Sequence, residues 1–230
     1  DLLKQHFVLN YFEATLVQFA FFGAYFTGSA VYFACSYFYG DMISRIGYKN
    51  CIIAGLLIAA LACLMFYPSS GFRLYWMFLA ALFFLGLGFT LLQIAANPYV
   101  IVLGQENSAS GRLNLAQGVN SLGTTLAPLV GGFFLFRFIG NHGTMGEDMI
   151  RNMYLIFAFV FIVLALVMKF VPLPVLAGRT DSVRGAGALK HRNLVMGIIA
   201  IFTYVGGEVS IGSLLIGYLK LPAIAGLPEA

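Results

Sequence analysis

Six long apolar runs, separated by short polar segments, constrain this chain more than any other feature of its sequence. They cover approximately residues 14–39, 51–67, 75–103, 113–138, 153–171 and 194–219. A helix needs about 20 mostly apolar residues to cross a bilayer. Because lipid offers no hydrogen-bond partners, a spanning segment must pair its own backbone groups, as a helix does. The runs therefore predict an all-α membrane protein.

The composition agrees with a surface that faces lipid. Of the 230 residues, 60% are hydrophobic and 10% are charged, whereas a soluble domain usually carries about 25% charged residues. So few charges could not cover a surface exposed to water. The formal net charge of +4 is small and spread over the loops, so it gives no indication of nucleic-acid binding.

The sequence contains no recognisable catalytic or metal-binding arrangement. Cys35, Cys51 and Cys63 lie in or beside apolar runs, and the three histidines stand in separate segments. A zinc site needs clustered ligands. The motifs HExxH and GxSxG and a glycine-rich phosphate loop are absent. We therefore expect no enzyme activity, no cofactor, no metal and no disulfide.

The charges of the loops predict the orientation of the chain in the membrane. Basic residues are more numerous after the first, third and fifth runs, and most of the excess lies in the polar, Gly-rich segment 172–192. Cytoplasmic loops usually carry such an excess of Lys and Arg. We therefore expect this side to be cytoplasmic.

This orientation places the N-terminus outside, with no signal peptide to carry it there. A further helix upstream would remove the inconsistency, so we number the six runs two to seven of a larger protein. Residues 1–171 are then a six-helix half whose first helix is missing or incomplete. Residues 172–192 form a cytoplasmic loop between two halves, and residues 193–230 carry the first helix of the second half.

Small residues and prolines inside the runs indicate how the helices pack. Glycine, alanine and serine let helix backbones approach closely in lipid, and we expect this of Gly86, Gly88, Ala95, Ala96, Gly118, Ser121 and Gly123. Proline inside a helix removes one backbone hydrogen bond and can kink it. Pro98 and Pro128 are therefore either packing kinks or bends beside a pathway.

Polar side chains inside the spans indicate a ligand site, because polarity in lipid is costly and usually faces a partner or a cavity. Gln93 and Asn97 are four residues apart and share one helical face. The next run carries a polar stripe at spacings of three to four, formed by Asn114, Gln117, Ser121 and Thr124, with Asn120 beside it.

Carboxamides both donate and accept hydrogen bonds, as neutral, hydroxyl-rich ligands require. An ion pore would favour rings of charge or backbone carbonyls. The alternative is that these groups only bond one helix to another. Two facing stripes favour a cavity over that alternative.

Glu208 is the only acidic residue well inside a predicted span, and it lies in a stretch rich in Gly and Ser. It could be a buried carboxyl that is hydrogen-bonded to a neighbouring helix. It could instead be a ligand of a coupling ion or a substrate, the usual role of an ionisable group in a span. The glycines also favour local unwinding, which transporters use at binding sites.

Several segments resemble the fucose/glucose-galactose symporters of the major facilitator superfamily. Segment 92–104, LQIAANPYVIVLG, is similar to their fourth helix, and segment 112–123, with RLNLAQ and NSLG, to their fifth. Segment 204–213 resembles the seventh helix of the glucose-galactose branch, and segment 21–26 resembles the second helix. The resemblance implies two six-helix halves and a central site reached by alternating access.

The resemblance also implies roles for single residues. Gln117 and Asn120 match the sugar-binding carboxamides of the fifth helix. Gln93 stands where the fucose symporter has a proton-coupling glutamate, so this position has no ionisable group. Asp1 is the one match for an aspartate of the family's first helix, at a spacing that is too short.

The loop after the first run resembles the signature loop of the superfamily. Gly40, Arg45, Gly47 and Lys49 keep its pattern, whereas Ser44 occupies the position of its aspartate. Arg45 and Lys49 are therefore candidates for a gating role.

These features predict a partial chain of a major facilitator superfamily helical bundle that moves a hexose or related sugar with a proton or a sodium ion. The candidate substrate-binding residues are Gln93, Asn97, Gln117 and Asn120, and the coupling-ion candidate is Glu208. We expect a multi-pass monomer in a bacterial inner membrane. The alternatives are a sugar-binding sensor or structural domain and an exporter of amphiphilic compounds, which should show an aromatic, apolar pocket without a carboxamide stripe.

Overall fold

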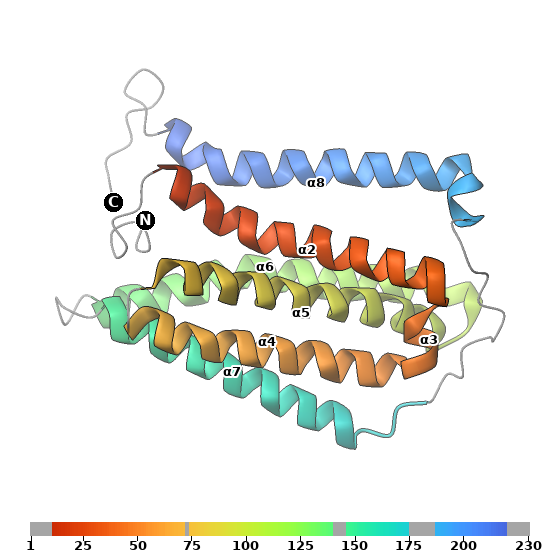
Figure 1. Cartoon of the computed structure of the whole chain (residues 1–230), viewed down its shortest axis with the longest axis horizontal. Helices are drawn as coiled ribbons and strands as arrows, with labels where there is room; N and C mark the ends of the chain where they lie inside the picture. The colour runs from red at the N-terminus through yellow and green to blue at the C-terminus, as the bar shows by residue number, and fades with distance from the viewer. Residues whose placement is uncertain (1–10, 72–73, 140–145, 175–186, 220–230) are drawn as a thin grey trace. The chain divides into compact units, whose positions relative to one another are not determined.

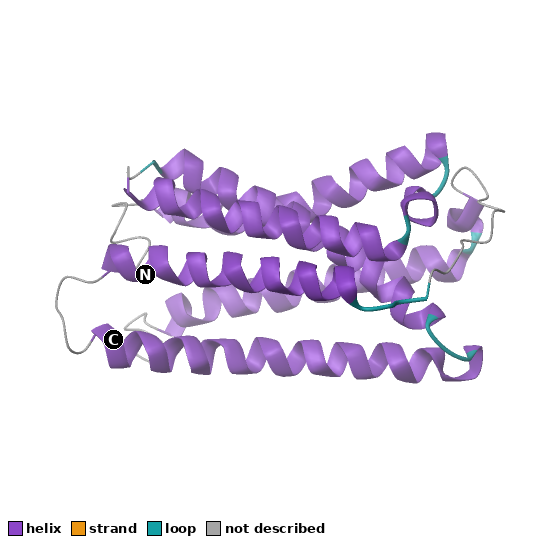
Figure 2. Ribbon diagram, turned by 90° about the horizontal axis from the view of Figure 1, so that it is seen from below, coloured by secondary structure: helices purple, strands orange, loops and turns teal. Residues whose placement is uncertain are grey.

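A computed structural model describes residues 11–71, 74–139, 146–174 and 187–219 (Figure 1). The long helices are α2 (Tyr11–Tyr39), α4 (Tyr48–Gly71), α5 (Tyr75–Val102), α6 (Ala109–Ile139), α7 (Gly146–Phe170) and α8 (Arg192–Leu219). Short elements lie between them: α3 (Met42–Ile46) and the 3-10 helices η1 (Glu106–Ser108) and η2 (Gly187–Lys190). The described residues contain no strand (Figure 2). The predicted all-α architecture is confirmed.

Each predicted apolar run corresponds to one long helix, but the helices extend beyond the runs. The run 51–67 became α4, which begins at Tyr48 and continues through Pro68 to Gly71. The apolar pattern does not predict its polar first turn, which includes Lys49 and Asn50. Pro98 and Pro128 lie inside α5 and α6, as predicted.

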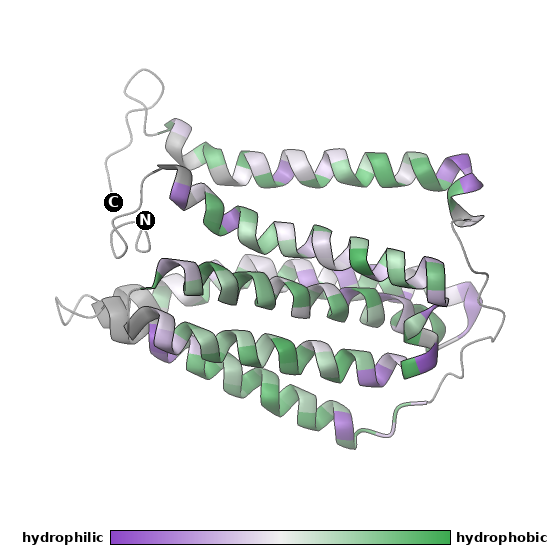
Figure 3. Ribbon diagram, viewed as in Figure 1, coloured by the Kyte–Doolittle hydropathy of each residue, from purple (hydrophilic) through white to green (hydrophobic). Residues whose placement is uncertain are grey.

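Within the described ranges, five helices are long and apolar enough to cross a membrane. They cover Thr15–Tyr39, Tyr48–Ser69, Tyr75–Val102, Arg151–Phe170 and Arg192–Gly212. In Figure 3, apolar residues run along α4 and α7, and hydrophilic residues gather at the ends of these helices. The sixth long helix, α6, is not among the five, and its sequence carries the polar stripe described above.

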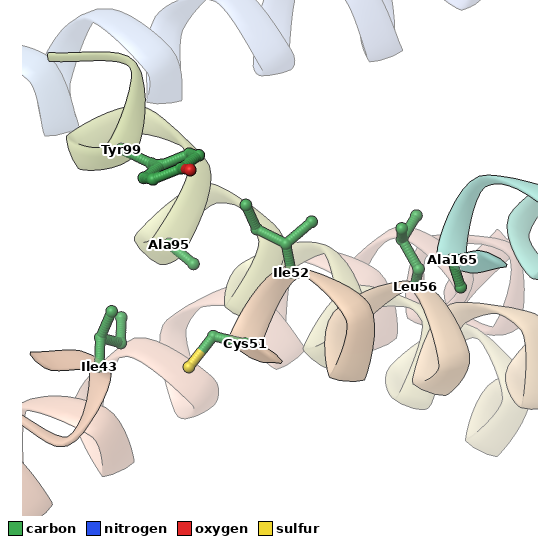
Figure 4. Packing of buried hydrophobic residues seen from close by; sticks show 7 residues of the cluster. All are labelled: Ile43, Cys51, Ile52, Leu56, Ala95, Tyr99 and Ala165. Carbon is green, nitrogen blue, oxygen red and sulfur yellow. The ribbon is translucent and has the colours of Figure 1, made fainter. Parts of the chain in front are cut away.

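The chain divides into two compact units, residues 1–182 and residues 183–230. In the first unit, α5 packs against α2, α4 and α6, and α4 also packs against α7. One cluster of buried side chains joins α3, α4, α5 and α7 (Figure 4); it consists of Ile43, Cys51, Ile52, Leu56, Ala95, Tyr99 and Ala165. A second cluster contains Phe66, Phe78 and Ala81. These clusters fix α5, the helix that carries two of the candidate site residues.

Two glycines allow α5 to approach its neighbours closely. A Cβ atom at Gly86 would lie 2.7 Å from the Phe21 carbonyl oxygen and from the Ala24 Cβ on α2. A Cβ at Gly88 would lie 2.9 Å from the backbone of α4, at Gly55 and Ala59. The small residues of α5 therefore have the packing role that was predicted for them.

The glycines of α6 behave differently. A Cβ atom at Gly118 or Gly123 would meet no described atom within 4 Å. The close approach predicted for these two residues does not occur within the described chain. Small residues permit close helix packing but do not enforce it.

Candidate functional site

The four carboxamide candidates lie on α5 and α6, which run antiparallel to each other. Gln117 Nε2 on α6 donates to Asn97 Oδ1 on α5 at 3.4 Å, the long end of the hydrogen-bonding range. Asn97 is half-buried and Gln117 is exposed. The structure thus brings together one residue from each predicted stripe.

Gln93 and Asn120 lie beyond this pair in the same direction along the bundle. Gln93 is one turn before Asn97 on α5, and Asn120 is about one turn after Gln117 on α6. Both side chains are exposed. The four carboxamides therefore form two successive levels along the α5–α6 pair, of which the Asn97–Gln117 level is joined by a hydrogen bond.

Two hydroxyl groups on α6, one in the stripe and one beside it, bond to their own helix. The Thr124 and Thr125 hydroxyls donate to the Ser121 carbonyl oxygen at 2.8 and 3.0 Å. Their protons are therefore engaged, whereas a carboxamide keeps both donor and acceptor atoms available. The carboxamides are the better equipped groups on α6 to bind a ligand rich in hydroxyls.

Glu208 lies on α8, in the second compact unit, and is exposed there. Gly206 and Gly207 precede it, and a Cβ at either position would meet no described atom within 4 Å. The helix is continuous through this stretch, so the predicted unwinding is not present. Glycine lowers the stability of a helix, but a helix in lipid loses much more by breaking its backbone hydrogen bonds.

The signature loop is built around α3. Asp41 is the N-cap of this helix, and its Oδ1 accepts a hydrogen bond from the Ile43 backbone nitrogen at 3.1 Å. The Tyr32 hydroxyl on α2 donates to the same carboxylate oxygen. Gly40 and Gly47 flank α3 with φ angles of 82° and 91°, which side chains with a Cβ rarely adopt. The glycines of the signature are therefore required by the turn at each end of α3.

The two candidate gating residues differ in their surroundings. Lys49 Nζ donates to the carbonyl oxygens of Lys169 and Val171, at 2.9 and 2.8 Å, at the end of α7. This contact ties the start of α4 to the end of α7 and gives a partner to the Lys169 carbonyl, which lies in the last turn of α7. Arg45 is exposed on α3.

Sequence reasoning missed the roles of Tyr99 and Arg112. The Tyr99 ring stacks on Tyr48, with centroids 5.5 Å apart, and its hydroxyl donates to the Pro174 carbonyl oxygen at 3.2 Å. Arg112 donates to carbonyl oxygens at the end of α5. Both residues lie in the two segments that carry the family resemblance, so that resemblance was the available signal.

The remaining predictions concern the inter-half loop, the N-terminus, metal binding and the cysteines. Asp1 and residues 175–186 of the predicted inter-half loop lie outside the described residues. Within the described ranges, no three His, Cys, Asp or Glu side chains are placed to hold a metal ion. Cys35, Cys51 and Cys63 are free thiols.

Comparison with known proteins identifies the superfamily. The family model of the Major Facilitator Superfamily matches residues 2–227. A glucose/galactose transporter of Brucella abortus is 43% identical over 232 residues, which are 99% of this chain and 54% of the relative. An L-fucose-proton symporter of Escherichia coli is 29% identical over 242 residues, which are 94% of this chain and 53% of the relative.

A solved structure is similar in fold as well as in sequence. The crystal structure of a variant of the Escherichia coli fucose:proton symporter aligns with a TM-score of 0.69 and 28% identity, covering 95% of this chain and 57% of that chain. The chain spans about half the length of the curated relatives that it matches. Its helices, its packing around α5 and the match over nearly all of its residues agree: the chain belongs to the Major Facilitator Superfamily.

Proposed function

We propose that this chain is part of a symporter that moves a hexose or related sugar together with a cation by alternating access. The observation that carries the proposal is the pair Asn97 and Gln117, which places donor and acceptor groups from two helices at one level of a transporter fold. The names of the relatives, a glucose/galactose transporter and an L-fucose-proton symporter, support a sugar as the substrate.

A sugar suits these groups because each hydroxyl both donates and accepts hydrogen bonds. Gln93, Asn97, Gln117 and Asn120 are neutral and together supply four NH2 groups, each with two N–H donors, and four carbonyl acceptors. A sensor or structural domain that binds sugar without moving it would use the same groups, so only a transport assay separates it from a symporter. An exporter of amphiphilic compounds is disfavoured by the carboxamides.

Glu208 is the coupling-ion candidate in this proposal. It is the only acidic residue of the described part of α8, and Gln93 on α5 cannot ionise. Whether the ion is a proton or sodium is decided by how uptake depends on each ion. Arg45 on α3 and Lys49 on α4 are the gating candidates, and the Lys49 ammonium already joins the start of α4 to the end of α7.

Replacing Gln117 by alanine is expected to weaken sugar binding by about 1–3 kcal/mol, or roughly 5- to 150-fold in Kd. The truncation removes one partner of the sugar and leaves the Asn97 carboxamide without its bond from α6. Isothermal titration of the purified full-length protein with glucose, galactose and fucose would measure the change.

The control for this prediction is Thr125→Ala, also on α6, because the Thr125 hydroxyl donates to a carbonyl oxygen of its own helix. We expect Thr125→Ala to keep the wild-type affinity. If Gln117→Ala binds each sugar as tightly as the wild type, the pair does not contact the sugar.

The proposed topology places the inter-half loop, residues 172–192, in the cytoplasm between residues 1–171 and 193–230. We expect a cysteine introduced at the exposed His191 to be labelled by a membrane-impermeant maleimide only after cells are opened. A cysteine at the exposed Leu74, between α4 and α5, should be labelled in intact cells. Both variants are made without the native cysteines. Labelling of the His191→Cys variant in intact cells would show that the orientation is the opposite of the one proposed.

A further inference from the structure

Arg112, in the first turns of α6, is bonded to the end of α5 through all of its guanidinium nitrogens. Its Nε donates to the Val100 carbonyl oxygen at 3.1 Å, and its Nη2 donates to the Ile101 carbonyl oxygen. Its Nη1 donates to the Gln105 carbonyl oxygen at 3.0 Å and to the Ser108 hydroxyl. One side chain therefore joins the last turn of α5, the connecting loop and the first turn of α6.

These acceptors explain why an arginine is needed. α5 ends at Val102, and the last carbonyls of a helix have no partner within it. A guanidinium presents five N–H donors in a rigid plane, whereas a lysine ammonium presents three on a flexible stem. Arginine can thus hold several carbonyls at fixed relative positions, and lysine cannot reproduce that arrangement.

Gly104 makes the space that the guanidinium occupies. A Cβ atom at this position would lie 2.7 Å from Arg112 Nη1 and 2.9 Å from Arg112 Cζ. Such contacts are far shorter than normal van der Waals distances, so any side chain at Gly104 would displace the guanidinium. Arg112 and Gly104 therefore act as one unit at the turn between α5 and α6.

This unit lies close to the carboxamide pair along both helices. Arg112 precedes Gln117 by five residues, and its acceptor Val100 follows Asn97 by three. With a rise of 1.5 Å per residue, these separations are only about 7.5 and 4.5 Å along the helix axes. The packing of α6 on α5 is less extensive than that of α2 or α4 on α5, so few other contacts fix how far α6 slides along α5.

We infer that Arg112 is a positioning residue that sets the register of α6 against α5 and thereby holds Gln117 opposite Asn97. It does not contact the sugar, and it acts through the Asn97–Gln117 pair. The expected effect of Arg112 on sugar binding rests on the proposed function. The role of Arg112 in the register of the two helices does not depend on that function. A plain helix cap would stabilise the fold without affecting the pair.

The test uses two changes that disturb the unit from opposite sides. Arg112→Lys keeps the charge and removes the planar set of donors, and Gly104→Ala keeps Arg112 and displaces it. The control is Gly111→Ala, where a Cβ would meet no described atom within 4 Å. Each change is made in the full-length protein, with and without Gln117→Ala.

The first readout is the register itself. Asn97→Cys and Gln117→Cys are combined in a background without native cysteines and treated with a short bifunctional thiol reagent. We expect efficient cross-linking between the two cysteines when Arg112 is unchanged and in the Gly111→Ala control. Most of this cross-linking should be lost in the Arg112→Lys and Gly104→Ala variants. Unchanged cross-linking in both variants would overturn the inference.

The second readout is sugar affinity. We expect Arg112→Lys and Gly104→Ala each to weaken sugar binding by roughly 3- to 30-fold. Both changes should have little further effect once Gln117 is alanine, because the effects of substitutions that act through the same contact do not add. Additive effects, or lower thermal stability with wild-type affinity, would show a simple cap and overturn the inference. If the wild type binds no sugar while cross-linking is still lost, the proposed function fails and the register assignment stands.

Discussion

Replacing Glu208 by glutamine is expected to abolish uphill accumulation of sugar while the protein remains folded in the membrane. The change keeps the size of the side chain and removes its ionisation. Gln93 on α5 is neutral, and the described membrane spans contain no acidic side chain other than Glu208 that could balance the charge of a coupling ion. A potential of 100 mV is worth about 2.3 kcal/mol per charge, which sustains a sugar gradient of roughly 50-fold. That gradient should disappear.

The measurement is uptake of labelled sugar into proteoliposomes under an imposed proton or sodium gradient. The control is Glu106→Gln, an exposed carboxylate in the 3-10 helix η1, which should accumulate sugar like the wild type. Exchange of sugar without a gradient should survive in Glu208→Gln. If this variant accumulates sugar normally and keeps the wild-type dependence on pH and sodium, Glu208 has only a structural role.

Replacing Gly86 by valine is expected to prevent the first unit from folding correctly. The new Cβ would lie 2.7 Å from the Phe21 carbonyl oxygen of α2, and backbone cannot move aside as the end of a flexible side chain can. Overpacking in a core typically costs about 1–3 kcal/mol and occasionally more. Because the obstacle here is a neighbouring helix, we expect the cost to reach or exceed the upper end of that range.

The yield of monodisperse protein and its thermal unfolding temperature measure this effect. The control is Gly197→Ala on α8, where a Cβ would meet no described atom within 4 Å, and which should leave both quantities unchanged. Wild-type yield and unfolding temperature for Gly86→Val would mean that α2 and α5 lie further apart than the structure places them.

The sequence was sufficient to predict the number and order of the long helices, because each apolar run is long enough to require one. It was less informative about their ends. α4 includes the polar residues Lys49 and Asn50 and continues past Pro68, since a helix can extend from the lipid into the interface. The short helix α3 was also missed, because its N-cap, Asp41, is recognisable only once the turn at Gly40 is known.

The candidate site was predictable one helix at a time. The spacing of Gln93 and Asn97 places them on one face of α5, and the spacing on α6 gives the facing stripe. The bond between Asn97 and Gln117 was not predictable, because it depends on how far α6 slides along α5. That register depends on interactions across the turn, such as those of Arg112 with the end of α5. The spacing of polar and apolar residues along one helix gives no information about such interactions.

Entrance counterflow in proteoliposomes tests the central claim most directly. Vesicles that contain the full-length protein are loaded with an excess of unlabelled hexose and diluted into a trace of the same labelled hexose, without an ion gradient. A transporter that alternates its site between the two sides should concentrate the label transiently inside, and Gln117→Ala should diminish this overshoot. Binding of the sugar without any overshoot would contradict transport and identify a sensor, and an overshoot with an amphiphilic compound but with no hexose would contradict the sugar.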